Sequence, residues 1–171
     1  MHDDKTTHQE RLDRNQHLVG RANQTPKKDH DADGTEDACQ AFGFLRGIRD
    51  RADAIEFRFV DGNSVWFPYG WLGNWKFNPS EGLLLKFSGD LVYLVLIKGS
   101  NLDMPLGETG INLMRAGLQR HRIVWVREMT KEEVSVLGES APTVDSIEIG
   151  EFESNEDLRV WVGERAPALL H

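Results

Sequence analysis

The sequence predicts an α+β domain with a mostly antiparallel five-stranded sheet, or a partly open small barrel, with an N-terminal helix and one or two further helices. Residues 55–59 alternate apolar and charged side chains, which is typical of a strand with one buried face. Residues 91–97 are apolar throughout, which indicates a strand inside a sheet that is covered on both faces. Within residues 37–51, Phe44 and Ile48 stand at helical spacing, which favours a helix before the first strand.

The first two strands are expected to form a hairpin around an Asp-Gly-Asn turn. Residues 61–63 supply this turn between the apolar runs 55–59 and 65–69. A loop of these three residues pairs Phe57 with Phe67 and places the large apolar side chains of both strands on one face. A two-residue loop would not do so, and we therefore expect the three-residue loop.

Turn signals delimit the next elements. Residues 70–82 combine Gly, Asn, Pro and Ser and are predicted to be a loop. Residues 83–87 and 91–97 flank a Ser-Gly-Asp turn, so they are predicted to be two antiparallel strands.

A second helical region and a last strand follow. Apolar residues at helical spacing predict a helical stretch over residues 111–118, and residues 123–126 read as a fifth strand. Thr130 begins a capping box that opens a short helix, and Gly138 is expected to end that helix.

Charge and aromatic residues are unevenly distributed along the 171 residues, whose formal net charge is -8. The net charge is -3 over residues 1–41, +2 over residues 42–130 and -7 over residues 131–171, and none of the 15 aromatic residues lies in the first of these parts. A segment without aromatic residues cannot bury enough surface to offset the entropy of ordering. We therefore predict a disordered polar tail over residues 1–35, a single α+β domain over residues 36–130, and an acidic C-terminal segment that docks partly on the domain.

Composition and motifs argue against several classes of protein. No apolar run approaches the ~20 residues of a membrane span, and the first residues are too polar for a secretory signal, so we expect a cytoplasmic protein without membrane contacts. Cys39 is the single cysteine, which excludes an intrachain disulfide and a cysteine zinc site. No nucleophile elbow, zinc-binding helix or phosphate-binding loop occurs. We therefore predict that the protein is not an enzyme and uses no cofactor.

One acidic stretch resembles the opening of an EF-hand calcium loop. Asp29, Asp31 and Asp33 alternate before Gly34, as in loops whose carboxylates supply oxygen ligands to Ca²⁺. The twelfth position of such a loop requires a bidentate glutamate, and Gln40 stands there. An acidic linker fits the same residues, and we prefer it to a metal site.

A tryptophan-rich stretch is the first candidate binding surface. It contains Trp66, Trp71 and Trp75, and the expected hairpin register sets Trp66 opposite Arg58 on the outer face. Large aromatic side chains usually build the core of a small domain. Tryptophan and arginine are also enriched at interaction hot spots, so an exposed aromatic patch is the functional alternative.

A basic group near the end of the predicted domain is the second candidate. It surrounds Trp125 and consists of Arg115, Arg120, His121, Arg122 and Arg127. Basic side chains beside an aromatic ring can bind phosphates and stack on bases. They can also pair with the acidic segment 131–171 of the same chain, which is the interpretation that we favour.

Residues 97–102, with the sequence Ile-Lys-Gly-Ser-Asn-Leu, resemble the second box of Sm-like RNA-binding proteins. The helix expected over residues 37–51 and the turn at residues 61–62 stand in the order found in that family. The resemblance implies that Lys98 and Gly99 help to line a nucleotide pocket in a ring of subunits. A strand end followed by a turn explains the same string.

These observations lead to one preferred function and one alternative. We predict a non-catalytic protein-interaction or adaptor domain with a protein partner. The alternative is an RNA or single-stranded nucleic-acid binding module that uses the basic group and exposed tryptophans.

Overall fold

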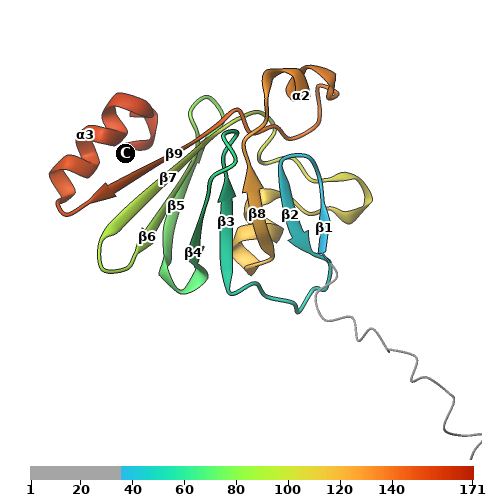
Figure 1. The fold of residues 1–171 in the computed structure, drawn as a ribbon, viewed down its shortest axis with the longest axis horizontal. Helices are drawn as coiled ribbons and strands as arrows, with labels where there is room; N and C mark the ends of the chain where they lie inside the picture. The colour runs from blue at the N-terminus through green and yellow to red at the C-terminus, as the bar shows by residue number, and fades with distance from the viewer. Residues whose placement is uncertain (1–35) are drawn as a thin grey trace, which may run out of the picture. The chain divides into compact units, whose positions relative to one another are not determined.

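The computed structural model describes residues 36–171 (Figure 1). The tail predicted over residues 1–35 and the calcium loop considered at Asp29, Asp31 and Asp33 lie outside the described residues. The described residues contain a five-stranded sheet in the order β1-β2-β8-β3-β4 and a four-stranded sheet in the order β5-β6-β7-β9. Helices combined with mainly antiparallel sheets are therefore confirmed. The prediction of a single five-stranded sheet is wrong, however, because the strands divide between these two sheets, and they do not form a closed barrel.

The five-stranded sheet combines strands from distant parts of the chain. In spatial order its strands are β1 (Glu36–Ala38), β2 (Phe42–Leu45), β8 (Ile123–Arg127), β3 (Ala54–Arg58) and β4 (Ser64–Pro68). Neighbouring strands are antiparallel except β3 and β8, which run parallel. Within the described residues β4 pairs only with β3, so one edge of β4 is free.

The helix predicted over residues 37–51 is wrong, because these residues form β1, β2 and the loop after them. Phe42 and Phe44 are both buried in the core, at the period of two that a strand requires. Gly43 between them faces the other side, where an added Cβ would overlap the indole ring of Trp125 on β8. The glycine that weakens a helix is thus the residue that lets this strand accept a large neighbouring ring.

The predicted hairpin of β3 and β4 is present, but its register differs from the expected one. Phe57 lies opposite Val65, and Ile55 lies opposite Phe67. The loop comprises residues 60–62, which is one residue earlier than predicted. The shift along β4 is two residues, so Ile55, Phe57 and Phe67 keep the faces that were expected for them.

The side chain of Asp61 explains the earlier loop. Its carboxylate accepts hydrogen bonds from the backbone N–H and the side-chain amide of Asn63 at 2.9 and 2.8 Å, and these bonds lower the pKa of Asp61. The N–H of Phe59 then donates to the carbonyl of Asn63 at 2.9 Å. This local turn closes the loop before the apolar residues of β4 can pair in the predicted register.

The four-stranded sheet is antiparallel throughout and consists of β5 (Leu72–Asn78), β6 (Gly82–Ser88), β7 (Val92–Lys98) and β9 (Ser146–Phe152). The internal strand predicted over residues 91–97 is confirmed, because β7 lies between β6 and β9. Val95 and Ile97 face the main core, whereas Leu94 and Leu96 face a second, smaller core.

The loop predicted over residues 70–82 is wrong for most of its length. The stretch contains the end of the short helix η1 (Tyr69–Trp71) and the whole of β5. A bulge between Leu72 and Trp75 interrupts the pairing of β5 with β6. The glycine and asparagine that signal a loop therefore belong to an irregular edge strand.

The remaining helices are short except for α3 (Asn155–Arg165). They are η2 (Gly107–Thr109), the π-turn η3 (Leu113–Gly117), η4 (Leu118–Arg120), α2 (Lys131–Val136), α3 and η5 (Pro167–Leu169). The helical stretch predicted over residues 111–118 is thus an irregular pair of turns. The predicted capping box is confirmed, because the hydroxyl of Thr130 accepts a hydrogen bond from the N–H of Glu133 and the carboxylate of Glu133 accepts one from the N–H of Thr130.

The two sheets enclose the main core between them. The rings of Phe67 and Phe87 stack with their centroids 4.6 Å apart, and Phe57 meets Phe87 edge-on at 6.1 Å. The smaller core lies between the other face of the four-stranded sheet and the pair α3–η5. No helix among residues 36–171 has the length and apolar character needed to cross a bilayer.

Candidate functional site

Three of the predicted site residues lie on the face of the five-stranded sheet that is turned away from the main core. Trp66 on β4 lies opposite Glu56 on β3, and Glu56 lies beside Trp125 on β8. We call this row, together with Arg58, the tryptophan face. The predicted pairing of Trp66 with Arg58 is wrong, because the register of the hairpin is shifted by two residues.

Polar contacts connect the tryptophan face. Arg58 Nε donates to Glu56 Oε2 at 2.7 Å, and the guanidinium carbon of Arg58 lies 4.6 Å from the centroid of the Trp125 ring. Trp125 Nε1 donates to Glu36 Oε1 at 2.6 Å. Trp125 is consequently 9% exposed, whereas Trp66 is 59% exposed. The free aromatic surface on this face belongs to Trp66.

Trp71 and Trp75 have different surroundings. Trp71, in η1, stacks on Tyr93 with ring centroids 6.4 Å apart and covers Gly89. Trp75, in β5, packs against the main core. Among the described residues no ring–ring contact joins either of them to Trp66. Trp75 therefore has the structural role that large aromatic residues usually have, whereas Trp71 is 37% exposed and covers Tyr93 and Gly89 with one side of its ring.

The predicted basic group is divided between several environments. Burial lowers the pKa of Arg122, and the positive charge of Arg120 lowers it further. The guanidinium of Arg122 donates to the backbone carbonyls of Leu45 and Arg46 at 2.9 and 2.8 Å, so it anchors the loop after β2. Arg115, on η3, is exposed.

His121 is packed on a buried tyrosine. His121 lies between η4 and β8, and its ring stacks on Tyr69 with centroids 4.4 Å apart. The hydroxyl of Tyr69 donates to the carbonyl of Ile123 at 2.7 Å, and burial raises the pKa of Tyr69. The histidine thus covers a structural side chain.

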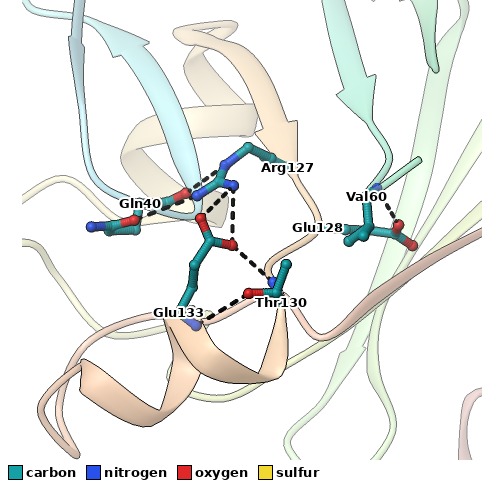
Figure 2. Close-up of polar contacts among 6 residues, drawn as sticks. All are labelled: Gln40, Val60, Arg127, Glu128, Thr130 and Glu133. Atoms are coloured by element: carbon teal, nitrogen blue, oxygen red, sulfur yellow. Dashed lines mark hydrogen bonds and ion pairs between the residues drawn. The ribbon is translucent and has the colours of Figure 1, made fainter. Parts of the chain in front are cut away.

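Arg127 is paired with the C-terminal segment (Figure 2). Its guanidinium donates to Glu133 at 2.9 Å and to the carbonyl of Gln40 at 3.2 Å. The hydrogen bond from the N–H of Thr130 and then the hydrogen bond from Arg127 lower the pKa of Glu133. Glu133 of segment 131–171 thus neutralises Arg127. In the part of the chain that the structure describes, no ion pair joins this segment to the other members of the predicted basic group.

A neighbouring loop contributes basic residues that the sequence interpretation assigned to a helix. Arg51, in the loop between β2 and β3, lies close enough to Arg122 to lower its pKa. Ile48 in the same loop is 71% exposed. We call Arg51, Arg120 and Arg122 the arginine cluster. The alternation of arginine, glycine and aspartate over residues 46–51 is the signal that would have indicated a charged loop.

Glu128 joins the two sheets (Figure 2). One of its carboxylate oxygens accepts a hydrogen bond from the N–H of Val60, in the loop after β3, at 2.9 Å. The other accepts one from the N–H of Ile147, on β9, at 2.7 Å. Both carboxylate oxygens of Glu128 therefore accept hydrogen bonds that stabilise the fold.

The residues of the Sm-like string make contacts within the chain. Lys98 Nζ lies 3.6 Å from the carboxylate of Glu148 on β9, and a Cβ at Gly99 would overlap the carbonyl of Thr143. Asn101 has a φ of 57° and donates to the carbonyls of Glu139 and Ala141. These contacts fit a strand end that fixes the segment before β9.

Comparisons of the chain with protein-family models, with curated proteins and with solved structures found no match. Among residues 36–171, no group of three or more histidine, cysteine, aspartate or glutamate side chains comes together as a metal site would require. Burial raises the pKa of the Cys39 thiol, which lowers the fraction of reactive thiolate at neutral pH.

A second candidate site is a cavity of about 400 Å³ between the four-stranded sheet and the pair α3–η5. Its lining includes the cationic side chains of Lys76, Lys86 and Arg159. The sequence interpretation missed this cavity, because Lys86 lies on β6 and Arg159 on α3, and no local pattern brings them together.

Proposed function

We propose that the domain is a non-catalytic protein-interaction module that binds an extended segment of a partner protein along the free edge of β4. The observation that carries the proposal is this edge, which has no strand neighbour among residues 36–171 and bears the exposed ring of Trp66. Addition of a strand at such an edge gains affinity from main-chain hydrogen bonds and specificity from adjacent side chains.

The hairpin register identifies the backbone groups that a partner strand would meet. Phe59 donates to the carbonyl of Asn63, so the odd-numbered residues of β4 direct their N–H and C=O groups toward β3. The N–H and C=O groups of Ser64 and Trp66 consequently point to the free edge. Pro68 has no N–H and limits the length over which a partner strand could pair.

The charges of the tryptophan face favour a polypeptide over a polyanion. Arg58 forms an ion pair with Glu56, and the Trp125 ring is bonded to Glu36. Binding of a phosphate backbone requires cations that carry no internal partner. An extended peptide requires backbone hydrogen bonds and apolar contact, which Ser64 and Trp66 offer together.

Selection of short random peptides against the full chain tests this proposal. We expect selected peptides to protect the amides of Ser64 and Trp66 from hydrogen exchange. Ser64→Pro removes one donor from the free edge, and Trp66→Ala removes the aromatic contact, so each should weaken peptide binding by about tenfold. Trp71→Ala is the matched control, and it should change the affinity by less than about twofold.

Two outcomes would overturn the proposal. One is protection that maps to residues outside β4 and the tryptophan face. The other is an equal loss of affinity in Trp66→Ala and Trp71→Ala, because a general loss of stability would then explain both. Thermal melting of every variant separates loss of fold from loss of binding.

The alternative function, binding of RNA or single-stranded nucleic acid, is favoured by a different observation. In the arginine cluster, Arg51 and Arg120 lie near Arg122, and no carboxylate forms an ion pair with these three within the described residues. A labelled single-stranded RNA should then bind at low salt, and Arg120→Gln should lower both the affinity and its salt dependence. Absence of binding at low salt would remove this alternative.

A further inference from the structure

We propose that the cavity beneath α3 binds a small amphipathic carboxylate, a molecule with one anionic head and an unbranched apolar chain. The cavity lies on the outer face of the four-stranded sheet, and the pair α3–η5 forms its opposite wall. Its volume of about 400 Å³ is within the range of ~300–1,000 Å³ typical of small-molecule sites. The site is separate from the tryptophan face, so this inference does not depend on the proposed function.

The inner part of the cavity is apolar. Leu84 and Leu94 supply it from the sheet, and Val162 and Leu169 supply it from α3 and η5. These four side chains are between 2% and 8% exposed. An alkyl chain that enters here exchanges water for apolar contacts on both sides, which is the main source of affinity for such a molecule.

The charged part of the lining is entirely cationic. Lys76, Lys86 and Arg159 contribute to it, and the lining contains no aspartate or glutamate. This is notable in a chain that carries 28 acidic and 20 basic residues. Neither Lys86 nor Arg159 has an ion pair or a side-chain hydrogen bond within residues 36–171, so both remain available to a carboxylate.

Lys76 has a different role from the other two cations. Its Nζ donates to the carbonyls of Leu169 and His171 at 3.0 and 3.2 Å, so it holds the end of η5 against β5. Lys76 therefore positions one wall of the cavity, and Lys86 and Arg159 are the groups assigned to the anionic head. Charge-assisted hydrogen bonds from these groups would orient the head at the cationic part and the chain toward the apolar part.

Calorimetric titration of the full chain with decanoate, kept below its micellar concentration, tests the proposal. We expect saturable binding of one equivalent. Lys86→Gln and Arg159→Gln should each weaken it by about three- to tenfold, and the double variant should weaken it further. Lys131→Gln, which removes an exposed lysine of α2, is the matched control and should leave the affinity unchanged.

Three comparison ligands separate the contributions of head and chain. Decanol lacks the charge, decyltrimethylammonium reverses it, and acetate lacks the chain, so each should bind at least about tenfold more weakly than decanoate. Equal binding of decanol would show a purely apolar site, and equal binding of acetate would show a simple anion site; either result overturns the proposal. Absence of saturable decanoate binding, or unchanged affinity in the double variant while its melting temperature matches that of the unsubstituted chain, would also overturn it.

Discussion

The outer faces of the two sheets differ in whether their charged side chains are paired and in whether a helix covers them. On the five-stranded sheet, polar side chains are already paired within the chain: Arg58 forms an ion pair with Glu56 of the same strand, β3, and Trp125 of β8 donates a hydrogen bond to Glu36 of β1. On the four-stranded sheet, the helix α3 covers an apolar cluster and leaves a cavity whose cations, Lys86 and Arg159, have no ion pair in the described part of the chain.

This difference indicates which class of ligand suits each face. A surface whose charges are already paired gains little from a charged ligand, but its free strand edge and exposed ring of Trp66 can receive a polypeptide. A concave site with apolar walls and uncompensated cations gains from a small molecule that supplies both an anion and a chain.

Truncation of one side chain on each face gives the largest expected contrast. Leu94 is 2% exposed under α3, so Leu94→Ala should lower the free energy of unfolding by about 2–5 kcal/mol. Trp66→Ala on the other face should lower it by less than about 0.5 kcal/mol, because Trp66 is 59% exposed. Urea denaturation measures both, and equal losses would mean that the two outer faces are not differently packed.

A smaller effect is expected where the two sheets are joined. Glu128→Gln keeps one acceptor but cannot accept from both Val60 and Ile147, so it should cost about 1–2 kcal/mol in urea denaturation. Glu108→Gln, at an exposed glutamate of η2, is the control for the change of charge. A loss no greater than that of the control would show that the carboxylate does not hold the sheets together.

The smallest expected effect concerns the pH dependence of the capping box. The folded state lowers the pKa of Glu133 below its ordinary value of 4.5, so its stabilising contribution is complete above that pH and is lost as the pH falls through the lowered value. The difference in unfolding free energy between the unsubstituted chain and Glu133→Gln should therefore shrink on acidification. Glu132→Gln, in the same turn, is the comparison, and a difference that grows on acidification would have the wrong sign.

Local patterns predicted the elements whose pairing is also local. The hairpin of β3 and β4, the strands β6 and β7 and the cap of α2 follow from neighbouring residues, and the structure confirms that they exist. The register of the first hairpin was wrong because the side chain of Asp61 bonds to Asn63 and closes the loop early. A single side-chain contact thus outweighed the pairing of apolar residues.

The strand β9, whose pattern of apolar residues is less regular, was not predicted from the sequence. In β9, Ile147 and Ile149 face the main core and Phe152 faces the smaller one, so apolar residues on both sides interrupt the alternation. Gly150 appears as a strand breaker, yet the rings of Phe152 and Trp161 lie where its Cβ would be. The place of Gly150 in the strand thus depends on the ring of Phe152 on the same strand and on Trp161 of α3, and periodicity does not reveal these contacts.

The candidate sites were predicted less well than the fold, because each depends on tertiary placement. Trp66, Trp71 and Trp75 look alike in sequence, but Trp66 alone lies on the tryptophan face. Lys86 and Arg159 meet in one cavity only because α3 folds back over β7. Neither arrangement has a signal within a window of neighbouring residues.

An amide NMR titration tests most directly whether the two outer faces are separate sites. With decanoate and then a selected peptide added to the same labelled chain, decanoate should shift the amides of Lys86 and Arg159, and the peptide should shift those of Ser64 and Trp66. The two sets should not overlap, and the affinity for the peptide should be unchanged when decanoate is saturating. Shifts of Ser64 and Trp66 on addition of decanoate, or displacement of one ligand by the other, would contradict the division of the molecule into a strand-edge site and a cavity site.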